Sequence, residues 1–114
     1  MDDVIVLINQ FGPLPITVTF QAPADGPLSL FLSGTAWTSA ANSMLQLALE
    51  LDGNPVGATA PTALFANNAG THMALPAVFI PINLTMGEHK LTLLNGSFTV
   101  NTDSNDFFHV SLHL

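Results

Sequence analysis

The sequence contains no cysteine and no tyrosine, and Lys90 is its only basic residue. A chain without cysteine forms neither a disulfide nor a zinc–thiolate centre, and it has no thiolate nucleophile. Phosphate binding requires several Lys or Arg side chains to displace counterions, whereas this chain carries a net charge of −7. These absences argue against nucleic acid, anionic membrane surfaces and acidic substrates as partners.

Long apolar runs are also missing. No stretch approaches the roughly 20 apolar residues that a membrane helix needs. The N-terminus begins acidic, and its apolar run at residues 4–8 is too short for an export signal. We therefore expect a soluble chain without a signal peptide or membrane insertion, in a compartment that the sequence does not identify. Its length of 114 residues predicts one domain over residues 1–114.

Charged residues are scarce, at 8% of the chain against about a quarter in ordinary soluble domains, and hydrophobic residues reach 48%. So few charges cover the surface of a lone domain poorly. In residues 4–8, moreover, both faces of an extended strand would be apolar. Such a strand should be covered on both sides, so the sequence predicts self-association.

Apolar and polar residues alternate through much of the chain. In "MLQLALELDG", Leu45, Leu47, Leu49 and Leu51 share one face, and the alternation ends at an Asp-Gly pair typical of hairpin turns. "PITVTFQA" and "LSLFLSGTAW" have the same period, and Gly34 in the second indicates a close approach or a bulge. Further strands are expected at 4–8, around Val56, and at 71–80, 89–94, 97–100 and 107–114.

No segment carries clear helix start and stop signals. Short strands separated by regular turns predict an all-β fold, an antiparallel jelly-roll sandwich of about 8–10 strands.

Five segments together resemble the jelly roll of the tumour-necrosis-factor (TNF) and complement-globular-head superfamily. They are "LFLSGTAW", "LQLALELDGNPVG", "GTHMALPAVFIPINL", "GEHKLTLL" and "DSNDFFHVSLHL", and the likeness runs from about Pro15 to Leu114. The resemblance implies a homotrimer that binds proteins or sugars, with the first and last strands beside the subunit interface. The chain departs from the family in having no tyrosine, so its packing near a threefold axis must differ.

The last expected strand places two histidines on the face opposite its core side chains. His109 and His113 would lie roughly 13 Å apart along a strand. That distance is too long for one zinc ion, whose ligand bonds are about 2 Å. The histidines are then either ordinary partly buried side chains or parts of a subunit contact. The expected oligomer interface consists of Val4, Val6, Ile8, Phe107, His109 and His113.

The stretch before that strand, "DSNDFF", has two interpretations. Asp103, Asn105 and Asp106 offer oxygen ligands for calcium, but EF-hand spacing is absent. Asp and Asn also favour tight turns because they bond to their own backbone. A structural turn is the favoured interpretation, with no metal site predicted and these three residues kept as weak calcium candidates.

Catalytic patterns are missing. There is no Gly-x-Ser-x-Gly elbow and no His-Glu-x-x-His motif. Glu88 and His89 adjoin on a strand, so their side chains point to opposite faces. The sequence therefore predicts no enzyme and no cofactor.

Trp37 is the only tryptophan, and it lies on the face opposite the leucines of its strand. An exposed indole ring can stack on a sugar while nearby polar groups bind the hydroxyls. Burial in the core or in a subunit contact is the alternative. The candidate ligand-binding residues are Trp37, Asp52, Asn54, Asn67, Asn68 and His72.

These features favour a non-enzymatic homotrimeric, lectin-like module that recognises a carbohydrate or a protein surface. The alternative is a structural protein of a capsid, fibre or coat-like assembly, which needs no small ligand.

Overall fold

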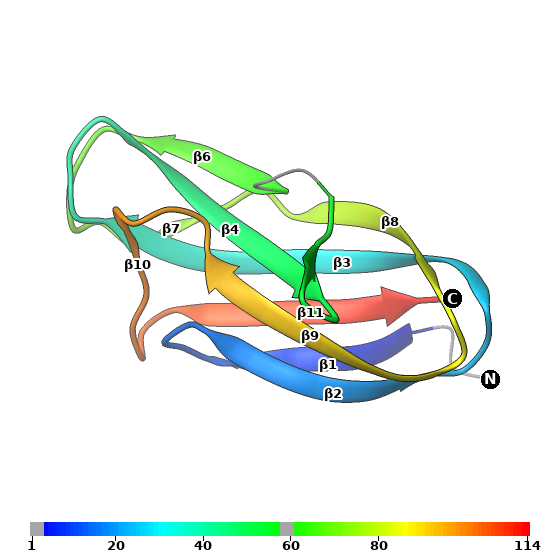
Figure 1. The fold of residues 1–114 in the computed structure, drawn as a ribbon. Coiled ribbons are helices and arrows are strands. Elements are labelled where there is room, and N and C mark those ends of the chain that lie inside the picture. Colours follow the sequence, from blue (N-terminus) through cyan, green and yellow to red (C-terminus); the bar gives the residue numbers. More distant parts are fainter. Residues whose placement is uncertain (1–3, 58–60) are drawn as a thin grey trace.

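Two antiparallel sheets pack face to face in the computed structural model, which describes residues 4–57 and 61–114 (Figure 1). Within these ranges the chain forms eleven strands and no helix. The strands are β1 (Val4–Phe11), β2 (Ile16–Ala22), β3 (Gly26–Thr38), β4 (Ser43–Leu51), β5 (Asn54–Pro55), β6 (Thr62–Ala66), β7 (Met73–Ala74), β8 (Val78–Leu84), β9 (Gly87–Asn95), β10 (Val100–Asn101) and β11 (Phe107–His113).

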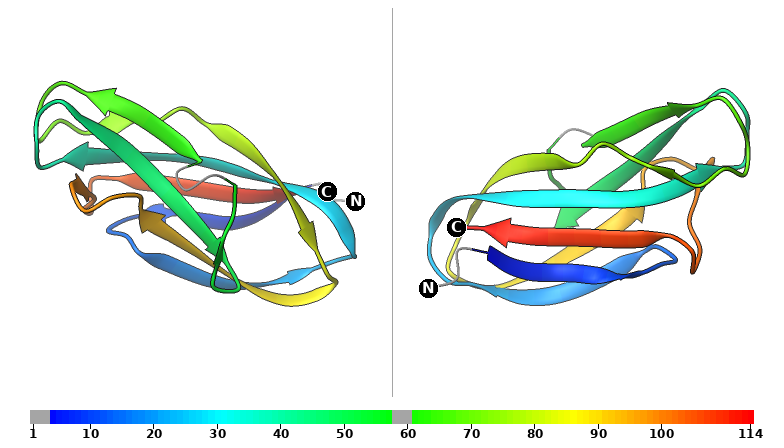
Figure 2. Two further views of the ribbon diagram at one scale, coloured as in Figure 1. Left: turned by 45° about the horizontal axis from the view of Figure 1, so that its top comes forward. Right: turned by 180° about the vertical axis from the view of Figure 1, so that it is seen from behind.

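The order of the longer strands is that of a jelly roll. Three of the eleven strands have only two residues, which leaves eight. One sheet runs β1-β11-β3 with β8 on the free side of β3, and the other runs β2-β9-β4 with β6 on the free side of β4. Successive strands thus alternate between the sheets, as in two interleaved Greek keys (Figure 2). The predicted fold class is confirmed.

The alternating leucines form the centre of the sandwich. Leu45, Leu47 and Leu49 of β4 are at most 1% exposed, and they face Phe108 and Val110 of β11, which are wholly buried. Leu51, at the end of β4, is partly buried against this core. The period-two pattern therefore assigned this strand and its inward face correctly, although leucine favours helices.

Gly34 allows the two layers to approach each other. A Cβ atom at this position would lie 2.7 Å from Cδ1 of Phe108 and 3.0 Å from Cδ1 of Leu47. Any larger residue would displace one of these rings or chains from the close-packed core. The predicted close approach is confirmed.

Two expected strand positions differ from the structure. The segment 71–80 was expected to be one strand, but it contains the short β7 and the beginning of β8, separated by residues around Pro76. β8 continues through Pro81 because it pairs only with β3 and has a free edge, where a missing N–H is tolerated. Strand β6 was not expected, and the strand expected at 97–100 is reduced to β10.

The register of β1 corrects the position of Ile8. A β-bulge between Val6 and Ile8 shifts the alternation, so that Ile8 pairs with Val110 and is 1% exposed in the core. Val4 and Val6 remain on the outer face, at 43% and 56% exposure. Ile8 therefore does not belong to the exposed surface on which strict alternation placed it.

Aromatic and imidazole rings cover the outer face of the six-stranded sheet. The ring of Phe31 lies 5.0 Å from that of Phe79 and 6.0 Å from that of His109, and the ring of His113 lies 5.2 Å from that of Phe79. We call these four rings the outer ring face. Phe107, also assigned outward by the alternation, is 37% exposed and packs edge-on against the exposed Phe11. In the described part of the chain, no helix is long and apolar enough to cross a membrane.

Candidate functional site

A buried carboxylate lies where β10, β11 and β3 meet. Asp106, immediately before β11, is 0% exposed. Its Oδ1 accepts a hydrogen bond from the hydroxyl of Thr35 at 2.8 Å, and its Oδ2 accepts one from the backbone N–H of Asp103 at 2.9 Å. The Thr35 hydroxyl oxygen in turn accepts the N–H of Phe107. These bonds offset the cost of removing the charge from water.

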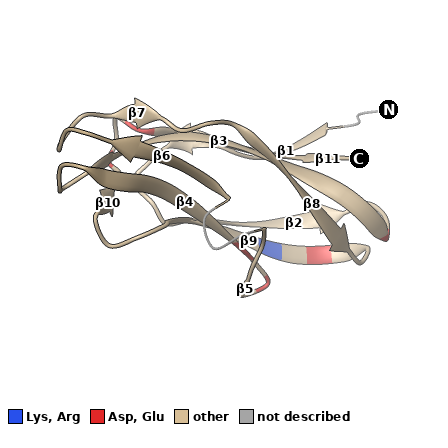
Figure 3. Ribbon diagram, turned by 90° about the horizontal axis from the view of Figure 1, so that it is seen from above, with Lys and Arg blue, Asp and Glu red and all other residues tan. Residues whose placement is uncertain are grey.

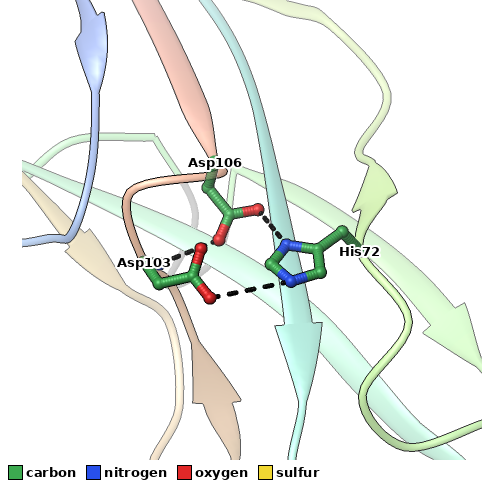
Figure 4. Close-up of side chains that lie close together, drawn as sticks. All are labelled: His72, Asp103 and Asp106. Atoms are coloured by element: carbon green, nitrogen blue, oxygen red, sulfur yellow. Dashed lines mark hydrogen bonds and ion pairs between the residues drawn. The ribbon is translucent and has the colours of Figure 1, made fainter.

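His72, just before β7, completes this arrangement (Figure 4). Its Nδ1 lies 2.8 Å from Oδ1 of Asp106, and its Nε2 lies 3.7 Å from Oδ2 of Asp103. The hydrogen bond with Asp106 raises the pKa of His72, the charges of Asp106 and Asp103 add to this, and partial burial opposes it. The side chains of His72 and Asp103 are 36% and 42% exposed, so solvent reaches this pair.

Trp37 lies beside the histidine on the outer face of β3. The ring centroids of Trp37 and His72 are 6.0 Å apart, and Asn101 of β10 pairs with Trp37 from the other side. The indole is half-buried, and its Nε1 has no hydrogen-bond partner among the described residues. The set Thr35, Trp37, His72, Asp103 and Asp106 is called the Trp37 cluster below.

The predicted ligand-binding residues separate into two groups. Asn67 and Asn68 are exposed in the loop between β6 and β7, where the carbonyl of Asn67 accepts the N–H of Asn42 at the start of β4. Asp52 and Asn54 lie at the other end of β4, roughly 26 Å away along a strand of nine residues. The structure thus brings Trp37 and His72 together and leaves Asp52 and Asn54 elsewhere.

The "DSNDFF" stretch forms the predicted turn. The N–H of Asn105 bonds to Oδ1 of Asp103, and the N–H of Asp106 bonds to the carbonyl of Asp103. Both carboxylate oxygens of Asp106 accept protein donors and point inward, so this residue offers little to an exposed ion. The geometry does not add support to the weak calcium candidates.

Thr35 and the partner role of Asp106 were not found from the sequence. The only signal was that Thr35 and Trp37 alternate onto the same face of one strand. Asp106 lies 71 residues beyond Thr35 and 34 residues beyond His72, so only the sheet topology brings them together.

Asp52 belongs to a second polar group. Its Oδ2 lies 2.6 Å from Nδ1 of His89, and its Oδ1 accepts the N–H of Lys90. Nε2 of His89 lies 2.6 Å from the carbonyl oxygen of Thr85. Both partners of the ring are acceptors, so both ring nitrogens must carry a proton and the ring is an imidazolium. The pair joins the turn after β4 to the turn before β9.

We expect the free energy of unfolding to fall between pH 6 and pH 9, in part through His89. The bond with Asp52, and then that with Thr85, raises the pKa of His89 above its ordinary 6.5. Its stabilisation is therefore complete below about pH 6.5 and is lost as pH rises through the raised folded pKa. The bond with His89 lowers the pKa of Asp52, so the carboxylate's contribution persists down to acid.

The measurement is urea unfolding at several pH values in the wild type and in His89→Gln. The variant should show a smaller loss of stability towards pH 9, while His72, whose pKa is also raised, supplies the remainder. Parallel curves for the two proteins would show that the imidazolium contributes nothing.

The fold occurs in proteins of very different sequence. No protein-family model matches the chain, and no curated protein matches it. A β-glucosidase from Paenibacillus barengoltzii has a TM-score of 0.58 at 12% identity over 96% of this chain, which spans only 10% of that protein.

Two shorter structures are similar over most of both chains. The CBM36-1 domain of a multidomain xylanase, from the hindgut metagenome of Trinervitermes trinervoides, has a TM-score of 0.51 at 12% identity and covers 97% of each chain. The C-terminal domain of EclA, described as a sugar-binding protein, has a TM-score of 0.50 at 15% identity, over 96% of this chain and 76% of that one. At such identities the likeness establishes the β-sandwich fold, and it does not single out the TNF and complement-head superfamily.

Proposed function

We propose that this chain is a non-enzymatic carbohydrate-binding module whose ligand site is the Trp37 cluster. The observation that carries the proposal is the position of a half-buried indole beside an exposed imidazole and an exposed carboxylate. A sugar ring presents an apolar face to an aromatic ring and hydroxyl groups to polar side chains. Trp37 would supply the first contact, and His72 and Asp103 the second.

The similar structures support this assignment without proving it. Two of them are a sugar-binding protein and a domain of a xylanase, and each matches this chain over nearly its full length. The scaffold is therefore one that serves sugar-binding proteins. Fold alone does not carry function, so the proposal depends on the residues of the Trp37 cluster.

The titratable groups are better suited to structure than to catalysis. Asp106 has no exposed surface and uses both oxygens in hydrogen bonds. His89 uses both ring nitrogens on Asp52 and Thr85. A general acid or base must reach the substrate with an available atom, which neither residue offers. This supports a binding module rather than an enzyme.

The test is a glycan array, followed by calorimetric titration of any glycan that binds. Trp37→Ala should weaken binding about tenfold or more, because a stacked ring contributes on the order of 1 kcal/mol beyond its buried area. Phe65→Ala is the matched control, since Phe65 is 52% exposed on the other sheet. Equal affinity of Trp37→Ala and wild type would remove the site from this cluster.

We further propose that the module is a homotrimer, TNF-like in arrangement, that associates through the outer ring face and its neighbours on β1 and β11. Phe79 is 62% exposed and Val6 is 56% exposed on this side. Covering them would bury apolar area, and three linked sites would raise the avidity of weak sugar binding. Light scattering should report three times the 12.0 kDa chain mass, and Phe79→Asp should report a monomer.

The same face is the observation that favours the second candidate function, a structural subunit of a capsid, fibre or coat-like assembly. A glycan array without any binder, together with assembly beyond a trimer in light scattering, would favour that function instead.

A further inference from the structure

We propose that His72 and Asp103 bind a divalent transition-metal ion, of the Zn²⁺ or Cu²⁺ type, and that Asp106 orients the imidazole for this role. The proposal concerns these side chains alone and does not depend on sugar binding. It is a different site from the turn oxygens considered for calcium, because its first ligand is a ring nitrogen.

The separation of the two ligand atoms fits one ion between them. Nε2 of His72 and Oδ2 of Asp103 are 3.7 Å apart, too far for a hydrogen bond. An ion about 2.0–2.1 Å from each atom would keep them roughly 3.3–3.8 Å apart, for angles between about 110° and 135° at the metal. The three ligand atoms of His72, Asp103 and Asp106 all lie within 4.8 Å of one another.

Asp106 supplies the support that metal-binding histidines commonly have. A ligating imidazole usually donates its second N–H to a carboxylate, which fixes the ring and the tautomer. Nδ1 of His72 lies 2.8 Å from Oδ1 of Asp106, and that carboxylate is itself held by Thr35 and by the N–H of Asp103. The ring is therefore oriented with Nε2 towards Asp103 and solvent, as Figure 4 shows.

The ligand types and the local charge select the ion class. Imidazole nitrogen suits Zn²⁺, Cu²⁺ and Ni²⁺, whereas Ca²⁺ and Mg²⁺ prefer oxygen ligands alone. Two carboxylates and an imidazole attract a divalent cation, and the chain's only lysine, Lys90, lies on β9 of the opposite sheet. Charged side chains are sparse elsewhere on the described ribbon (Figure 3). Two protein ligands leave the other coordination positions to water, so we expect micromolar rather than nanomolar affinity.

The single tryptophan provides a direct readout, since its ring centre is 6.0 Å from that of His72. Cu²⁺ quenches indole fluorescence at short range. Titration of the full chain, without a histidine tag, should therefore quench Trp37 along a saturating one-to-one curve. Excess Zn²⁺ should compete and restore the fluorescence, and Ca²⁺ should not.

Two variants and one control decide the assignment. His72→Gln and Asp103→Asn replace exposed side chains, and each should weaken binding at least about tenfold. His109→Gln, on the outer ring face, removes a different imidazole and should leave the curve unchanged. Circular dichroism confirms that each variant is folded. Quenching that rises linearly without saturation, or that is the same in His72→Gln as in wild type, would overturn the proposal.

Discussion

Leu47→Asp is expected to abolish folded, soluble protein. Leu47 is 0% exposed, at the centre of β4, and its Cδ1 lies against Gly34 of the opposite sheet. No cationic side chain reaches this position among the described residues, so a carboxylate there would be buried unpaired. Its cost, several kcal/mol, is comparable with the whole stability of a domain of this size, about 5–15 kcal/mol. Soluble yield and far-ultraviolet circular dichroism measure the outcome.

Gln46→Asp is the matched change on the neighbouring residue. Gln46 faces outward and is only partly buried, so its side chain can be solvated after substitution. Its backbone carbonyl, which accepts the N–H of Gly96, is unaffected. We expect folded protein with a stability within about 1 kcal/mol of wild type. Damage greater in Gln46→Asp than in Leu47→Asp would place the wrong face of β4 in the core.

The second large effect is expected for Asp106→Ala, which should lower the free energy of unfolding by about 2–4 kcal/mol. The substitution leaves the Thr35 hydroxyl and the Asp103 N–H without their acceptor. Each buried donor left unsatisfied costs about 1–3 kcal/mol. His72 also loses its partner, but it is partly exposed and turns to water at less cost. Urea unfolding followed by circular dichroism gives the difference.

Asp103→Ala tests whether the effect belongs to the buried carboxylate. The side chain of Asp103 is 42% exposed, and it accepts one hydrogen bond, from the N–H of Asn105. Its loss should cost less than about 1 kcal/mol, because water replaces the acceptor. If the two variants were equally destabilised, Asp106 would not be the residue that holds β3, β7 and β11 together.

The sequence predicted the layers well because burial on one face of a strand leaves a local pattern. The leucines of β4 and the Phe108–Val110–Leu112 face of β11 follow strict alternation, and all are buried as expected. Ile8 was misplaced because one extra residue in β1 changes the phase without changing the composition. β6 was missed because its burial alternates poorly along a short strand.

The candidate site was only partly predictable. The residue types were recognised singly, Trp37 for its ring and Asp103 and Asp106 for their oxygens. Their association depends on pairing of β3 with both β7 and β10, and these strands are only two residues long. Strands so short have no period to read, so no local signal placed His72 beside Asp106. Conversely, Asp52 and Asn54 looked like loop ligands but lie at the opposite end of β4.

The direction of β11 has a practical consequence for presenting the protein on a surface. Asp106 precedes the strand and Leu114 follows it, so its seven residues separate the Trp37 cluster from the chain's last residue by roughly 23 Å. Val4 pairs with His113, so the first described residue lies at that same far end (Figure 1). Immobilisation on a sensor chip or bead through either terminus would therefore turn the cluster towards solution. A linker inserted between β6 and β7 would instead obstruct it.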